Sequence, residues 1–112
     1  MKTVNVIDIL GTQYRVIQDN EPDKNPKLTN ALGYFEPCSK KLVISGIKED
    51  DNTVENLDDL KDCVLRHEIM HAFLYESGLY ESSDWAASEE MIDYFALQLP
   101  KIVAAMRAAE VL

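Results

Sequence analysis

The sequence has few of the features that define several common protein classes. It holds only two cysteines and eleven basic residues, against twenty acidic residues, in a chain of 112. The resulting formal net charge of −9 repels a phosphate backbone, which argues against nucleic-acid binding. No run approaches the roughly 18 apolar residues of a membrane span, so we expect no membrane contact. Internal repeats and low-complexity segments are also lacking.

The first residues lack the apolar core of a secretory signal, because Asn5 and Asp8 interrupt the run. We therefore expect a cytoplasmic protein. In that compartment, Cys38 and Cys63 are expected to stay reduced thiols rather than to form a disulfide. The acidic run over residues 48–51 is interpreted as a solvated surface.

The first half of the chain is expected to form a small sheet. Residues 3–17 are rich in Val, Ile and Tyr around Gly11, a pattern that predicts a hairpin of two strands. Residues 18–32 hold many Asp, Asn, Pro and Lys residues and are expected to form a loop. Residues 34–35 and 41–45 then predict a second strand pair.

The second half is expected to be helical. Asn56 is a good N-cap and Gly78 a plausible stop, so the apolar spacing between them predicts a helix over residues 57–77. After a short polar link, a second helix should be kinked or ended by Pro100. A last amphipathic helix over residues 101–111 completes the expected chain.

Together these elements predict an α+β fold in a single domain, residues 1–112. A small N-terminal β-sheet of three or four strands should pack on the first long helix. The C-terminal helical segment should lie beside that helix. The expected inward stripe of the first helix includes two histidines among apolar residues: Leu60, Val64, His67, His71 and Leu74.

The only two histidines of the chain lie in the motif HEIMH, residues 67–71. Because His67 and His71 are one helical turn apart on the same face, both imidazoles can bind one tetrahedral zinc ion, Zn²⁺. Glu68 is rotated by about 100° from His67, so it flanks the ion instead of binding it. Zinc lowers the pKa of a water that it holds, and Glu68 can take a proton from that water. Two hydrogen-bonded core histidines are the alternative interpretation.

A catalytic zinc ion needs a third protein ligand, and the second predicted helix offers Glu89. Asp93 lies four residues later on the same face, so it can hydrogen-bond the outer nitrogen of His67 or His71. Glu90 is the second choice, since it points about 100° away from Glu89. An exposed acidic helix start, stabilised by the helix dipole, is the alternative interpretation of these acids.

Peptide hydrolysis also needs a group that stabilises the oxyanion of the transition state. Tyr80, in the polar link, is the best-placed candidate, and Tyr75 and Tyr94 are alternatives. Cys63 lies four residues before the first histidine, but a buried thiol is the preferred interpretation over a metal ligand. Residues 42–45 are the expected sheet edge beside the cleft, where an extended substrate could pair as an added strand.

The order of these residues resembles the gluzincin arrangement, in which an acid after HExxH is the third ligand and a later acid orients a histidine. Residues 89–100, EEMIDYFALQLP, are similar to the Glu-x-x-Ala-Asn-x-Phe-Ala…Leu-x-Pro segment of ImmA/IrrE-type metallopeptidases from phages and mobile elements. Ile92 and Asp93 stand where that segment has Ala and Asn. The resemblance covers residues 33–100 and implies a zinc peptidase that acts on a specific protein.

The leading hypothesis is therefore a zinc-dependent endopeptidase with Glu68 as the general base and a protein or peptide as the substrate. The alternative is a catalytically silent, metal-stabilised module that binds or regulates a partner protein. A metal-free structural or regulatory protein is the third interpretation. The sequence indicates no oligomeric state.

Overall fold

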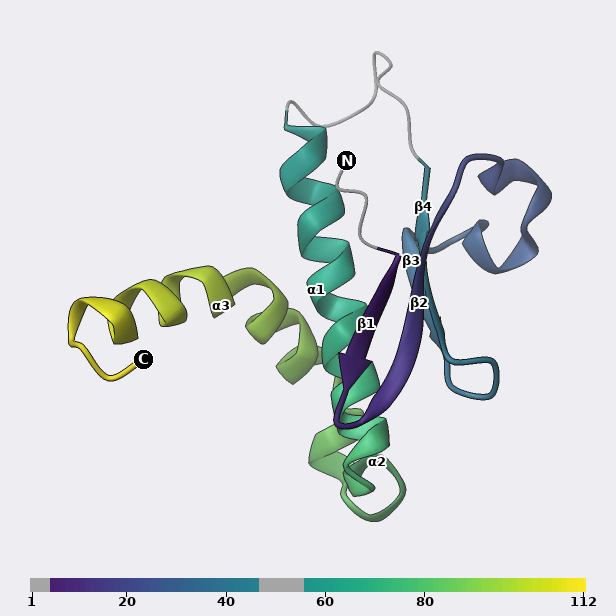
Figure 1. Cartoon of the computed structure of the whole chain (residues 1–112). Coiled ribbons are helices and arrows are strands. Elements are labelled where there is room, and N and C mark those ends of the chain that lie inside the picture. Colours follow the sequence, from purple (N-terminus) through teal and green to yellow (C-terminus); the bar gives the residue numbers. More distant parts are fainter. Residues whose placement is uncertain (1–4, 47–55) are drawn as a thin grey trace.

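The computed structural model describes residues 5–46 and 56–112, in which the four strands of one sheet precede the α-helices (Figure 1). Its spatial order is β1-β2-β4-β3. β1 pairs antiparallel with β2, β3 pairs antiparallel with β4, and β2 and β4 run parallel. The predicted α+β class is confirmed. The strands are β1 (Val6–Ile9), β2 (Thr12–Asp19), β3 (Gly33–Glu36) and β4 (Lys41–Ser45).

The two predicted strand pairs form where the turn residues permit them. Leu10 and Gly11, between β1 and β2, have positive φ values of 50° and 90°. Gly11 adopts such a value without strain because it has no Cβ. The Gly11 amide donates a hydrogen bond of 3.0 Å to Asp8 Oδ2, which closes the turn. Residues 1–4 lie outside the described residues, so the hairpin is confirmed only from β1 onward.

The order of the strands corrects the expected sheet edge. Residues 42–45 belong to β4, which is hydrogen-bonded on both sides, to β2 and to β3. Leu42, Val43 and Ile44 are at most 3% exposed, as a central strand requires. The edge strands are β1 and β3, and β3 is the one next to β4, because β4 pairs with β2 on its other side.

The predicted loop over residues 18–32 contains more regular structure than expected. β2 extends to Asp19, and two short 3-10 helices follow, η1 (Pro22–Lys24) and η2 (Pro26–Leu28). Each begins at a proline, whose fixed φ suits the first turn of a helix and whose missing amide is not needed there. The acidic run over residues 48–51 lies outside the described residues.

The first predicted helix is α1 (Leu57–Glu76), which forms the middle layer of the molecule (Figure 1). Asn56 Oδ1 accepts a hydrogen bond of 3.2 Å from the Asp59 amide, and Gly78 adopts a left-handed φ of 83° after the helix. One side of α1 packs on the sheet in a buried cluster of Ile9, Tyr14, Leu42 and Ala72. The other side joins the C-terminal segments in a cluster of Leu74, Ala86 and Ile92.

The chain after α1 differs from the expectation in two respects. The predicted polar link forms a helical turn, α2 (Leu79–Ser82), and a 3-10 helix, η3 (Asp84–Ala87), follows it. α3 (Glu89–Ala108) then continues through Pro100 as one helix, so the predicted separate helix over residues 101–111 does not form. Its C-terminal half extends away from α1 and the sheet (Figure 1). None of the helices in the described part of the chain has the length and apolar character needed to cross a membrane.

Candidate metal centre

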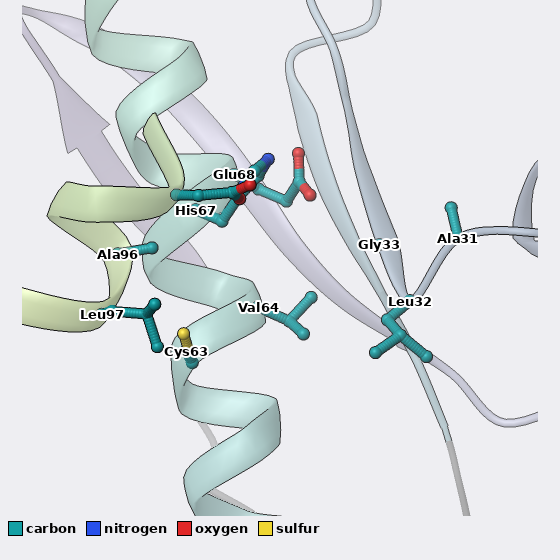
Figure 2. Close-up of a pocket in the computed structure, with 10 residues that line it drawn as sticks. Ala31, Leu32, Gly33, Cys63, Val64, His67, Glu68, Ala96 and Leu97 are labelled. Carbon is teal, nitrogen blue, oxygen red and sulfur yellow. The ribbon is translucent and has the colours of Figure 1, made fainter. Parts of the chain in front are cut away.

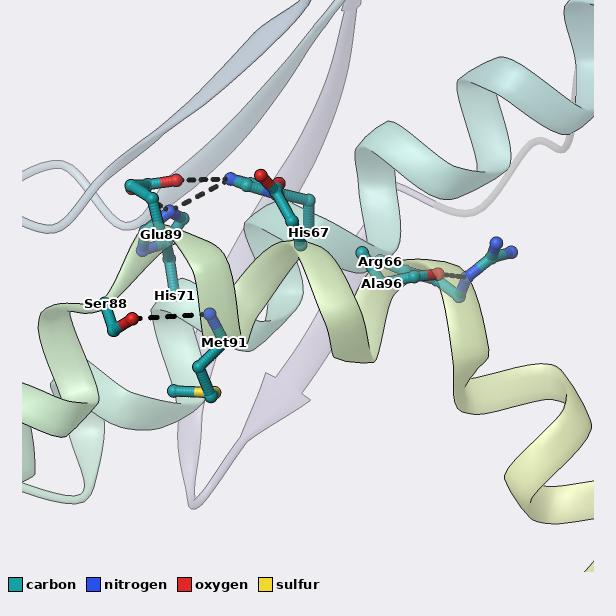
Figure 3. A network of polar contacts seen from close by, with 8 residues as sticks. Arg66, His67, His71, Ser88, Glu89, Met91 and Ala96 are labelled. Carbon is teal, nitrogen blue, oxygen red and sulfur yellow. Dashed lines mark hydrogen bonds and ion pairs between the residues drawn. The ribbon is translucent and has the colours of Figure 1, made fainter.

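Three predicted ligands converge between α1 and the first turn of α3 (Figure 3). The Nε2 atoms of His67 and His71 are 3.1 Å apart. Glu89 reaches both, with Oε1 3.0 Å from His71 Nε2 and Oε2 3.2 Å from His67 Nε2. A tetrahedral zinc ion with bonds of about 2.0–2.1 Å holds its ligands about 3.3 Å apart. The three side chains therefore have the chemistry and nearly the spacing of a zinc site that keeps one position open.

The outer nitrogens of the two histidines have different surroundings. His67 Nδ1 lies 2.9 Å from Asp93 Oδ1, so the carboxylate orients the ring and leaves Nε2 directed at the cluster. His71 Nδ1 is buried and has no hydrogen-bond partner within the described part of the chain. The His71 ring instead stacks on Phe35 of β3, with centroids 5.3 Å apart and planes inclined by 4°. Packing against β3 therefore orients His71, whereas a carboxylate orients His67.

The start of α3 determines which acid reaches the histidines. Ser88 caps this helix, because its Oγ accepts a hydrogen bond of 3.3 Å from the Met91 amide (Figure 3). Ile92 is fully buried in the cluster between α1, η3 and α3, which fixes the rotation of the helix. With that rotation Glu89, and not the second choice Glu90, contacts both imidazoles.

Glu68 lies beside the ligands in a less polar environment. It is 6% exposed, and burial, with a smaller contribution from the charge of Glu89, raises the pKa of its carboxyl group to about 7. β3 approaches α1 closely here, since a Cβ at Gly33 would lie 3.4 Å from Glu68 Oε2 and 2.8 Å from Val64 Cγ1. Burial also lowers the pKa of His71, although Glu89 opposes this, and so favours the neutral imidazole that binds metals.

A cavity of about 450 Å³ opens beside His67 and Glu68. Figure 2 shows α1 as its floor, with α3 on one side and the segment that leads into β3 on the other. Apart from His67, Glu68 and Asp93 at the ligand end, it is lined by small or apolar side chains. The cavity is therefore an apolar groove that ends at the candidate metal centre. Those small or apolar lining residues are Ala31, Leu32, Gly33, Cys63, Val64, Ala96 and Leu97.

The predicted tyrosine does not join the ligands. Tyr80 lies in α2, beyond the end of α1, and its ring packs 6.2 Å from the ring of Tyr75. Tyr75 in turn lies 6.0 Å from Phe35, so two rings separate Tyr80 from His71. The third candidate, Tyr94, is 57% exposed on α3 and contacts its neighbour Phe95. The prediction of an oxyanion-stabilising tyrosine stays a prediction.

The two cysteines are free thiols, Cys38 exposed and Cys63 partly buried. Cys63 lines the groove. Among the described residues, it is not one of the side chains close enough together to hold a metal ion, which are His67 with Glu68 and His71, and His67 with Glu89 and Asp93. Cys63 was expected to be a buried thiol, but it is only partly buried, and Glu89 stays the candidate for the third ligand.

Three residues near the site were not predicted from the sequence. Phe35 stacks on a histidine, Gly33 permits the close approach of β3 to Glu68, and Arg66 donates a hydrogen bond to the carbonyl of Ala96. Only the last had a signal in the sequence, because a proline inside a helix leaves the carbonyl four residues earlier without its usual donor.

Comparison of the chain with protein-family models, with curated proteins and with solved structures finds no significant match. The resemblance to ImmA/IrrE-type metallopeptidases therefore rests on the motif residues alone. The geometry of the ligand cluster is an independent basis for a functional proposal.

Proposed function

We propose that this chain is a zinc-dependent metallopeptidase that hydrolyses a peptide bond in a specific protein substrate. The observation that carries the proposal is the convergence of His67, His71 and Glu89, whose facing atoms are 3.0 to 3.2 Å apart, beside the buried Glu68. Two imidazoles and one carboxylate are a ligand set of catalytic zinc sites. A zinc ion bound there would polarise a substrate carbonyl and lower the pKa of a water.

The side chains around the ligands support complementary roles. Glu68, buried beside the ligands, is placed to transfer a proton from a zinc-bound water to the leaving amine. Asp93 holds the ring of His67 in the orientation that presents Nε2 to the ion. The negative charge of Glu89 would offset part of the charge of a bound zinc ion, to which the two neutral imidazoles contribute none.

The groove and the edge strand support a peptide as the substrate. An extended peptide could pair with β3, which has only β4 beside it among the described strands, while the apolar side chains of the peptide enter the groove. The small size of the domain favours selection of one protein through docking over general digestion. The resemblance to ImmA/IrrE-type enzymes agrees with such a narrow specificity.

The test compares the wild-type chain with Glu68→Gln and with Glu90→Gln as a matched control on the neighbouring helix. Each protein is purified, its zinc content is measured, and it is incubated with a library of peptides derived from a whole proteome. Mass spectrometry then counts new peptide termini. We expect one equivalent of zinc in all three proteins, and a cleavage rate that falls by orders of magnitude only in Glu68→Gln.

The other outcomes are equally informative. Zinc binding without cleavage by the wild-type chain, on peptides and on intact proteins, would contradict a peptidase and favour the metal-stabilised binding module. A wild-type chain that binds no zinc, even when the ion is supplied in excess, would exclude both of these functions. Loss of zinc in His71→Ala would identify the bound ion with this cluster.

A further inference from the structure

Pro100 leaves a buried carbonyl of α3 without its usual hydrogen-bond donor. In an α-helix the carbonyl of Ala96 would accept from the amide of residue 100, and proline has no amide hydrogen. Ala96 is 2% exposed, so water is poorly placed to replace the missing donor. A buried, unpaired carbonyl is unfavourable, yet α3 continues through Pro100 to Ala108.

Arg66 of α1 supplies the missing donor. Its Nε atom lies 2.6 Å from the carbonyl oxygen of Ala96, which makes a short, charge-assisted hydrogen bond between the two helices (Figure 3). Arg66 directly precedes His67, so the donor belongs to the same turn of α1 as the first ligand. The bond therefore joins the ligand-bearing part of α1 to a fixed point on α3.

That fixed point marks the end of the docked part of α3. Before it, Ile92 is fully buried and the Ser88 cap fixes the start of the helix. Directly after it, Leu97 is 61% exposed, and the C-terminal half of α3 extends away from the rest of the molecule (Figure 1). Glu89 and Asp93 lie between the cap and the fixed point, two turns and one turn before Ala96.

We propose that Arg66 is a positioning residue, which clamps the carbonyl freed by Pro100 and thereby holds Glu89 and Asp93 against the histidines. The clamp fixes both the rotation and the distance of α3 relative to α1. A shift of about 1 Å at Ala96 would carry Glu89 away from Nε2 atoms that it now meets at 3.0 and 3.2 Å. That these side chains bind a zinc ion rests on the proposed function, whereas the hydrogen bond between the two helices does not depend on it.

The test is a double-mutant cycle between Arg66→Met and Pro100→Ala. An alanine at position 100 restores the amide that the Ala96 carbonyl lacks, so the guanidinium becomes dispensable in that background. Arg107→Met is the matched control, because Arg107 is exposed on the unpacked end of α3. The affinity for Zn²⁺ is measured by competition with a chelating dye, and Co²⁺ absorption at saturation reports the ligand set.

We expect Arg66→Met to lower the zinc affinity by about tenfold, within the range for residues that orient metal ligands. At saturation, its Co²⁺ spectrum should shift towards that of Glu89→Ala. In the Pro100→Ala background, the same arginine change should lower the affinity by less than about threefold. Pro100→Ala alone and Arg107→Met should stay within about twofold of the wild type. Far-UV circular dichroism checks that every variant is folded.

Equal losses of affinity in both backgrounds, or no loss in Arg66→Met, would overturn the clamp. The cycle is repeated by measuring the free energy of unfolding in urea, on metal-free proteins with a chelator present. The clamp predicts that Arg66→Met lowers this free energy more when residue 100 is proline than when it is alanine. If the wild-type chain bound neither metal, the proposed function would fail. The urea cycle would then still decide the clamp, because absence of coupling there overturns it.

Discussion

The carboxylate of Glu76 leads to a quantitative prediction about the stability of the fold. It accepts hydrogen bonds from Thr12 Oγ1 at 2.9 Å, from the Tyr14 hydroxyl at 2.7 Å and from Lys40 Nζ at 2.8 Å. Since Glu76 is the last residue of α1 and the donors lie on β2 and before β4, these bonds tie the helix end to the sheet. The bonds from Lys40 and then Tyr14 lower the pKa of Glu76 to about 2.

The size of this contribution follows from the change in pKa. A decrease from 4.5 to about 2 corresponds to at most about 3 kcal/mol of folding free energy. The Lys40 side chain is 38% exposed, so solvent screens part of the attraction, and we expect about 2 kcal/mol. Because the folded pKa is depressed, this contribution is fully present above a pH of about 4.5 and is lost as the pH falls towards about 2.

The perturbation is Glu76→Gln, which keeps the shape of the side chain and removes its charge. The free energy of unfolding is measured in urea, on metal-free protein with a chelator present, from a pH of about 7 down to about 3. The wild-type chain should be more stable by about 2 kcal/mol from neutral pH down to a pH of about 4.5, and the difference should shrink below that pH. Glu81→Gln on α2 is the matched control and should change neither value, since Glu81 is exposed.

Two results would refute this reasoning. A difference between wild type and Glu76→Gln that stays constant over the whole pH range would mean that the depressed pKa is not its source. Equal stabilities at neutral pH would mean that Tyr14 and Lys40 gain nothing from the charge of Glu76. Taking the difference between the two proteins at each pH removes the contribution of every other carboxylate that titrates identically in both.

Two further predictions concern the site. Asp93→Ala should weaken zinc binding by about 10- to 100-fold, and Asp93→Asn, which can still accept a hydrogen bond from His67, should weaken it less; equal losses in both variants, measured by dye competition, would contradict an orienting role. Gly33→Ala should destabilise the chain by about 1–3 kcal/mol in urea, because the new Cβ would lie 2.8 Å from Val64 Cγ1 and 2.9 Å from the Val43 carbonyl, and unchanged stability would contradict the close approach of β3 to α1.

Elements that depend on neighbouring residues were predictable from the sequence. Asn56 and Gly78 mark the two ends of α1 through a side-chain cap and a left-handed φ, and both effects act within one helical turn. Gly11 likewise permits the β1–β2 turn through its own backbone conformation. In each case the interaction that determines the structure is between neighbouring residues, so it can be predicted from the local sequence.

Features that depend on distant residues were harder to predict. Pro100 was expected to kink or end its helix, and α3 does not end there, because Arg66, far away in the sequence, provides the donor that the Ala96 carbonyl needs. β4 is central because it pairs with β2, although β3 lies between these two strands in the sequence. The proline indicates that a carbonyl lacks its donor, but no local pattern identifies Arg66 as that donor or β2 as the partner of β4, because both contacts depend on which surfaces meet after the chain has folded.

The same distinction between local and distant interactions applies to the candidate site. Helical periodicity alone brings His67 and His71 to one face, so the sequence was sufficient for that pair. The approach of Glu89 depends on the turn made by α2 and η3, where the sequence predicted only a short polar link. Tyr80, which was assigned to that link, lies instead in a helical turn against Tyr75.

The position of the ligands follows from the two apolar faces of α1. Leu65, Ile69 and Ala72 face the sheet, whereas Met70 and Leu74 face η3 and α3. The histidines and Glu68 occupy the strip between those faces, where three layers of structure meet. A helix with a single apolar stripe would leave that strip in water, and neither the raised pKa of Glu68 nor the lowered pKa of His71 would follow. The packing that stabilises the fold is therefore also what shifts the pKa values of Glu68 and His71, so a change that loosens α3 from α1 alters the stability and these pKa values together.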